Sequence, residues 1–92
     1  MRIAALQHDI CWEDAAATCA HLAPMVATAA ADGADLIVLT EMFGPGFSLA
    51  ADRISEPPGG PTEQFLTEQA ATHGVWIGGS IPTRDRHDAH PV

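Results

Sequence analysis

The carboxylate of Glu41 is the strongest candidate for chemistry in this sequence because of the residues that precede it. Residues 36–39 form an apolar run, Leu-Ile-Val-Leu, of the kind that builds a buried strand. A side chain directly after such a strand lies at the carboxyl edge of the sheet, where open α/β sheets bind ligands. Apolar surroundings there favour a general base. The alternative is an ordinary acid that pairs with an arginine or faces water, and position alone favours this alternative.

Two cysteines, Cys11 and Cys19, offer thiols, but neither has the setting of a nucleophile. Cys19 falls on the apolar side of a predicted helix, where a free cysteine packs like a small hydrophobic residue. Cys11 follows the first predicted strand in a loop, and we expect it to be structural or incidental. Because no secretory signal precedes them, we expect both thiols to be reduced.

Two weaker patterns bear on ligands. The run Gly44–Leu49 begins like the G-x-G-x-x-G turn of dinucleotide-binding domains, but Leu49 replaces the third glycine and Pro45 removes a phosphate-facing donor. The polar tail 84–92 holds His87 and His90 with aspartates beside them, but no fourth-ligand spacing supports a metal site. We therefore expect no cofactor and no metal.

The elements that must position Glu41 follow from hydrophobic periodicity. The sequence predicts strands at 3–6, 36–39 and 75–77, and helices at 14–32 and 61–73. Gly33 and Gly74 fall where the two helices should end. Pro24 lies inside the first predicted helix, so we expect a kink or two shorter helices. Strands that alternate with helices predict a parallel α/β sheet, with the long loop 41–60 leaving its carboxyl edge.

Composition limits the size of the fold and the class of partner. A chain of 92 residues with 47% hydrophobic and 17% charged residues is typical of one globular domain with a small core. The chain has twelve acidic residues but only four arginines and no lysine. The resulting net charge of -8 argues against nucleic acid and anionic membrane as partners. With no apolar run near the roughly 20 residues of a membrane span and no signal peptide, we expect a cytoplasmic protein.

The most specific pattern joins the apolar run, Thr40-Glu41, an aromatic, a glycine and a second aromatic, over residues 36–47. This stretch resembles the first signature of the carbon-nitrogen hydrolase family, the nitrilase and amidase superfamily, with Thr40 where the family usually has proline. The opening residues 2–14 resemble the start of that family. Two further stretches also resemble the family: residues 56–62, and Ile77-Gly78-Gly79-Ser80 after the second predicted helix. The resemblance covers nearly all of the chain.

This resemblance implies an α-β-β-α sandwich and a Glu-Lys-Cys triad. In that triad Glu41 is the general base that activates a cysteine, which attacks a small-molecule amide or nitrile, with an amide favoured, and forms a thioester. The sequence has no lysine, it ends before the family's Lys and Cys motifs, and Cys11 lacks the flanking residues of the nucleophile motif. We therefore expect residues 1–92 to be the N-terminal portion of a carbon-nitrogen hydrolase domain, an incomplete sandwich of about three strands and two helices, and to be inactive alone.

Other functions and several properties stay open at this point. A noncatalytic remnant or interaction module would keep the same fold start and bind a partner through its open sheet. A nucleotide-binding α/β domain is a third alternative, which the missing glycine argues against. The substrate and assembly with identical chains are not determined. As part of a domain, the chain should expose the far face of its sheet, and Glu56, in the Pro- and Gly-rich loop, should be solvated.

Overall fold

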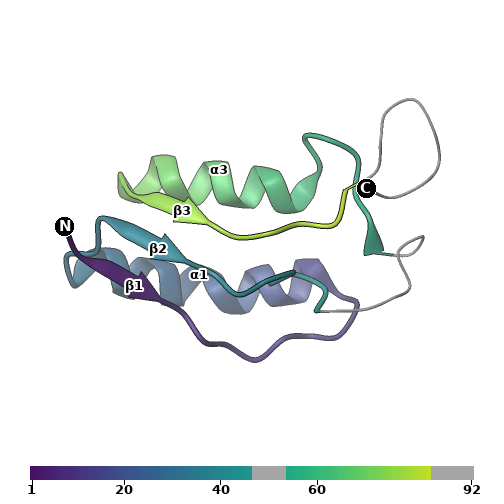
Figure 1. Ribbon diagram of the computed structural model, residues 1–92, viewed down its shortest axis with the longest axis horizontal. Helices are drawn as coiled ribbons and strands as arrows, with labels where there is room; N and C mark the ends of the chain where they lie inside the picture. The colour runs from purple at the N-terminus through teal and green to yellow at the C-terminus, as the bar shows by residue number, and fades with distance from the viewer. Residues whose placement is uncertain (47–53, 84–92) are drawn as a thin grey trace.

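Three parallel strands and two helices alternate along the chain in this computed structural model, which describes residues 1–46 and 54–83. The elements are β1 (Ile3–Ala5), α1 (Ala15–Ala31), β2 (Leu36–Val38), α3 (Pro61–His73) and β3 (Trp76–Gly78). The strands form one sheet in the order β1-β2-β3 (Figure 1). The predicted α/β class, with three strands and two helices, is confirmed.

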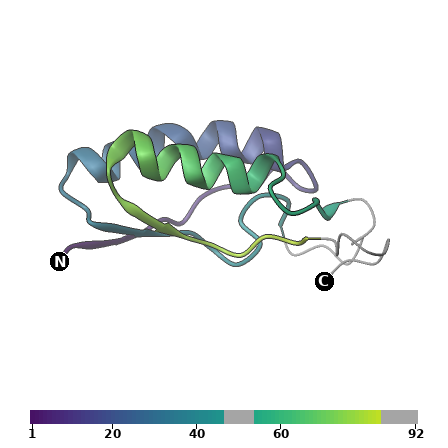
Figure 2. The same cartoon turned by 90° about the horizontal axis from the view of Figure 1, so that it is seen from above.

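The sheet register places β2 in the centre and turns one face toward the helices. Ile37 of β2 pairs with Ala4 of β1 on one side and with Ile77 of β3 on the other. Figure 2 shows α1 and α3 on the same side of the sheet. Because side chains alternate along a strand, this row faces the helices, and Ile37 is fully buried. The core therefore lies in a single layer between the sheet and the two helices.

Helix α1 is one continuous element although Pro24 lies inside it. Asp14 begins it, with its side chain accepting a hydrogen bond from the Ala17 backbone N–H. Leu22 and Val26, on either side of the proline, are both fully buried against the sheet. This packing holds the helix together where the proline removes a backbone bond, so the expectation of two shorter helices is wrong.

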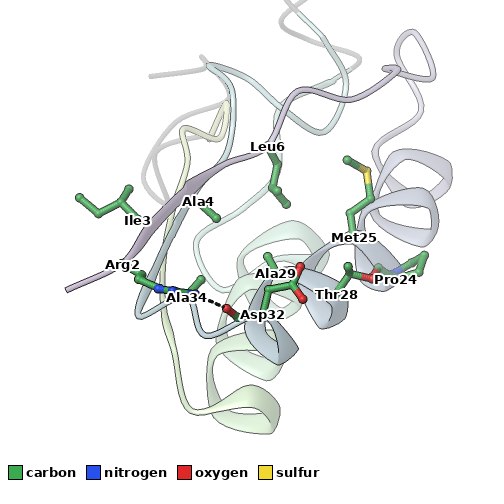
Figure 3. Close-up of a pocket in the computed structure, with 10 residues that line it drawn as sticks. All are labelled: Arg2, Ile3, Ala4, Leu6, Pro24, Met25, Thr28, Ala29, Asp32 and Ala34. Atoms are coloured by element: carbon green, nitrogen blue, oxygen red, sulfur yellow. Dashed lines mark hydrogen bonds between the residues drawn. The ribbon is translucent and has the colours of Figure 1, made fainter.

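The opposite face of the sheet has no covering layer in the described residues. Its apolar side chains include Ile3, Val38 and Trp76, with exposed fractions of 62%, 40% and 76%. The prediction that the far face is exposed is confirmed. A groove of about 640 Å³ also lies between the outer edge of β1 and the second half of α1 (Figure 3). No helix of the described chain is long and apolar enough to cross a membrane.

Candidate active site

Glu41 lies at the carboxyl edge of the sheet, as the sequence predicts. Backbone pairing continues just past β2, since the N–H of Leu39 donates to the Gly78 carbonyl at 2.8 Å. Leu39 is buried, and the chain turns at Glu41, whose side chain is exposed. The carboxylate is thus held at the end of the central strand, with its surroundings open in the described residues.

The turn that follows Glu41 is buried, and a backbone hydrogen bond closes it. Phe43, Gly44, Pro45 and Gly46 are all buried, and the N–H of Gly46 donates to the Met42 carbonyl at 3.0 Å. Gly46 has a φ of 87°, which suits glycine. Met42 has a φ of 46°, a conformation that residues with a Cβ seldom adopt. A buried turn with this geometry needs contacts from outside to keep it in place.

Neighbouring segments supply those contacts from both sides. After β3, the hydroxyl of Ser80 accepts a hydrogen bond from the Met42 N–H at 2.6 Å. After β1, Nε2 of His8 lies 3.1 Å from the carbonyl oxygen of Phe43. A carbonyl only accepts, so this ring nitrogen carries the proton. The chain extensions of all three strands therefore meet at the turn beside Glu41.

Close packing explains two glycines around this turn. A Cβ on Gly79 would lie 2.8 Å from the ring of Phe43, and one on Gly46 would lie 2.9 Å from the ring of Trp12. Contacts this short do not occur between real side chains, so both positions need glycine. The sequence points to the Gly78-Gly79-Ser80 segment only through its resemblance to a family. It predicts no role for Ser80 or His8.

Glu56 is not the solvated residue that the sequence suggested. One of its carboxylate oxygens accepts a hydrogen bond from the Thr62 backbone N–H at 2.8 Å, and the other accepts from the Thr62 hydroxyl. Its own N–H donates to the Pro82 carbonyl at 3.0 Å. The physical reason is that Gly60, at the start of α3, has no side chain with which to satisfy the first N–H groups of the helix. Glu56 caps the helix and is not a second catalytic acid.

The two cysteines of this segment are both unbridged, and the thiol of Cys19 is partly buried. Cys19 packs against the core, as predicted, and burial, with a smaller effect of the Glu56 charge, raises its pKa to about 11. It therefore stays a thiol at neutral pH. Cys11 is also unbridged, and its backbone N–H donates to the Thr18 hydroxyl at 3.0 Å.

Two weaker sequence patterns are partly or wholly outside the described residues. The tail histidines, His87 and His90, lie there, as does Leu49 of the glycine pattern. Within residues 1–46 and 54–83, no three His, Cys, Asp or Glu side chains gather as metal ligands would. Gly44 of that pattern is buried, and a Cβ on it would lie 3.1 Å from the Cβ of Ala15. The turn is thus packed on α1 rather than opened toward a phosphate.

Comparison with known proteins gives this arrangement a context. The family model for carbon-nitrogen hydrolases matches residues 2–91. Four chains of solved structures match, among them XC1258 from Xanthomonas campestris, described as a CN-hydrolase superfamily protein with an arsenic adduct in the active site. It shares 33% identity and a TM-score of 0.86, over 95% of this chain and 32% of that chain. No curated protein matches.

The family match and the structural match agree over almost the whole length of the sequence. The strand and turn that carry Glu41 lie within the matched residues, and the backbone follows that of XC1258 closely. The chain spans only 32% of that structure, so it corresponds to a part of such a domain. On this evidence, the chain belongs to the carbon-nitrogen hydrolase family.

Proposed function

We propose that this segment supplies the general base, Glu41, of an enzyme that hydrolyses non-peptide carbon-nitrogen bonds. The observation that carries the proposal is the place of Glu41, on a turn held from both sides at the carboxyl edge of the sheet. Its carboxylate is exposed there and open to a substrate. Family membership supports the reaction class, and the position of the carboxylate supports Glu41 as the base.

The other two groups of the reaction must come from elsewhere. The sequence has no lysine, and the raised pKa of Cys19, about 11, keeps that thiol protonated. XC1258 extends well beyond the part that this chain covers. We propose that the lysine and the nucleophilic cysteine belong to the part of the domain that corresponds to that remainder, and that the 92-residue chain alone is inactive.

In the complete site Glu41 would take the proton of the cysteine thiol, and the thiolate would attack the substrate carbon. With an amide, the carbon-nitrogen bond then breaks, and Glu41 returns its proton to the departing amine. Glu41 next removes a proton from water, whose oxygen attacks the carbon of the thioester. The carbon-sulfur bond breaks, the carboxylic acid leaves, and Glu41 returns its proton to the cysteine thiolate. We propose an amide rather than a nitrile as the substrate.

The test needs a complete domain, obtained by joining residues 1–92 to the part of XC1258 that this chain does not cover. We call it the joined protein. Glu41→Gln keeps the shape of the side chain but removes its basicity, so substrate binding should persist while turnover falls about 10²- to 10⁴-fold. Steady-state kinetics on a carboxamide and on a nitrile measure this loss and the substrate preference together.

Glu68→Gln on α3 is the matched control, because Glu68 is exposed and lies on a helix, away from the turn. It should keep parental turnover. If Glu41→Gln also stays within a few fold of the parent, Glu41 is a structural acid and the proposal is wrong.

A second candidate function is supported by the uncovered sheet face. A noncatalytic interaction module would use the apolar side chains Ile3, Val38 and Trp76 to bind a partner. It is favoured if the joined protein folds but hydrolyses neither class of substrate. A cytoplasmic location and the absence of a nucleic-acid partner stay predictions from the sequence, which leaves assembly with identical chains open.

A further inference from the structure

We infer that Ser80 is a positioning residue for Glu41, acting through the backbone of Met42. The inference rests on the proposed role of Glu41 as the general base. It goes beyond that role by naming the group that sets the direction of the carboxylate. The link between the two residues is the peptide bond that joins Glu41 to Met42.

That peptide bond joins the two residues through one planar, rigid peptide group. The Cα of Glu41 and the N–H of Met42 belong to the same planar unit. Ser80 Oγ accepts a hydrogen bond from this N–H at 2.6 Å. A hydrogen bond that fixes this peptide group restricts rotation of the backbone at Glu41. It therefore also restricts the direction in which the Glu41 carboxylate extends.

Met42 needs such an external contact more than an ordinary residue does. Its φ of 46° places it in the left-handed region, which it shares with only one other non-glycine residue, Glu13, in the described parts of the chain. For a residue with a Cβ this region is disfavoured, and surrounding structure must enforce it. The bond from Ser80 is made on the Glu41 side of Met42, where rotation would move the carboxylate.

Ser80 itself is anchored on both sides. Before it, Gly79 packs against the ring of Phe43, and the Gly78 carbonyl accepts the Leu39 N–H. After it, the Pro82 carbonyl accepts the N–H of Glu56. The segment that carries the hydroxyl is thus tied to β2 and to the start of α3. Ser80 is exposed, so its side chain can be changed without disturbing the core.

The experiment compares Ser80→Thr with Ser80→Val in the joined protein. The two side chains have the same shape, so any effect of size on folding is common to both, and only threonine keeps the hydroxyl. We expect Ser80→Val, and also Ser80→Ala, to lower kcat about 10- to 100-fold with KM within a few fold. Ser80→Thr should stay near the parent. Hydrogen exchange of the Met42 amide should be faster in the valine and alanine variants.

Thr28→Ala is the matched control, since it removes another exposed hydroxyl that makes a hydrogen bond to the backbone, here as the donor to the Pro24 carbonyl, away from the turn. It should leave kcat and the exchange of the Met42 amide unchanged. Equal kcat for Ser80→Val and Ser80→Thr, or unchanged exchange at Met42, would overturn the inference. If Glu41→Gln lowers turnover while the Thr and Val variants are equal, only the inference on Ser80 fails. If Glu41→Gln leaves turnover intact, the proposed function fails as well.

Discussion

The thiol of Cys19 shows how a side chain in this fold is controlled by its surroundings. It lies on the core side of α1, and burial is the main cause of its raised pKa, with the negative charge of Glu56 adding to it. Both effects disfavour the thiolate. In the enzyme that we propose, the nucleophilic cysteine lies outside this segment, and a Cys19 thiol that stays protonated does not compete with it for substrate.

The raised pKa of Cys19 predicts a specific dependence on pH. With a pKa of about 11, only about one thiol in a thousand is ionised at pH 8 in the folded state. Alkylation of Cys19 by iodoacetamide should therefore be slow at pH 8 and speed up about tenfold per pH unit up to pH 10. Peptide mass spectrometry measures the rate, and the same chain unfolded in urea should react much faster at pH 8.

The free energy of unfolding should also depend on pH in this range, because the Cys19 thiol holds its proton more tightly in the folded state than in the unfolded state. Between the ordinary pKa of 9.0 and the folded value of about 11, the unfolded state has released the Cys19 proton while the folded state keeps it. The folded state then binds more protons, so stability falls as pH rises through this window. The urea midpoint should drop less between pH 8.5 and 10.5 in Cys19→Ala, and an equal drop in both proteins would contradict the assignment.

At the scale of elements, the start of α3 depends on a residue outside the helix. The usual capping residue lies at the N-cap itself, but here Gly60 occupies that place and Glu56 reaches across the Pro-Pro-Gly-Gly turn to Thr62. The backbone of Glu56 also forms a parallel β-bridge with Thr83 after β3. This one residue thus ties the start of a helix, through its side chain, to the extension of an edge strand, through its backbone.

Removing this carboxylate should destabilise the protein measurably. Glu56→Ala leaves the Thr62 N–H and hydroxyl without their acceptor, and a lost helix cap costs about 0.5–2 kcal/mol. Glu56→Gln, which keeps one oxygen, should cost less. Urea unfolding of the joined protein measures both, with Glu68→Gln within about 0.5 kcal/mol of the parent as the control. Equal midpoints for Glu56→Ala and Glu68→Gln would show that the cap contributes nothing.

The strands, the helices and the place of Glu41 could be predicted from the sequence, because each depends on local periodicity or on glycine stops. Gly74, for example, ends α3 in the left-handed conformation that only its residue type suggests. The contact between Ser80 and Met42 could not be predicted, since a methionine gives no sign of a positive φ. The cap by Glu56 was missed because it spans six residues and follows no local capping pattern.

For the whole molecule, the main feature is a sheet with helices on one face only. Parallel sheets are normally covered on both faces. Here both helices lie on one side of the sheet (Figure 2), and Ile3, Val38 and Trp76 on the other face are exposed. The groove beside the outer edge of β1 adds a second uncovered surface (Figure 3). Both surfaces fit a chain that spans 32% of the length of a related structure.

The isolated chain should therefore bind an apolar dye and aggregate, whereas the joined protein should do neither. Dye fluorescence and light scattering measure this difference. Trp76→Thr, which replaces the most exposed aromatic of that face with a strand-compatible polar residue, should lower both signals in the isolated chain. A compact monomer that unfolds cooperatively without dye binding would contradict the assignment of this face as an internal surface of a larger domain.

The strand order of the sheet has a consequence for synthesis on the ribosome. Because β1, β2 and β3 neighbour one another in the order in which they are made, each strand can pair with the one that has just left the exit tunnel. Each pairing must still join residues far apart in the chain, since Ile3 pairs with Leu36 and Leu36 with Trp76, and parallel strands so separated pair slowly. While they pair, the apolar side chains of the uncovered face stay in water, which makes the nascent segment a natural substrate for chaperones.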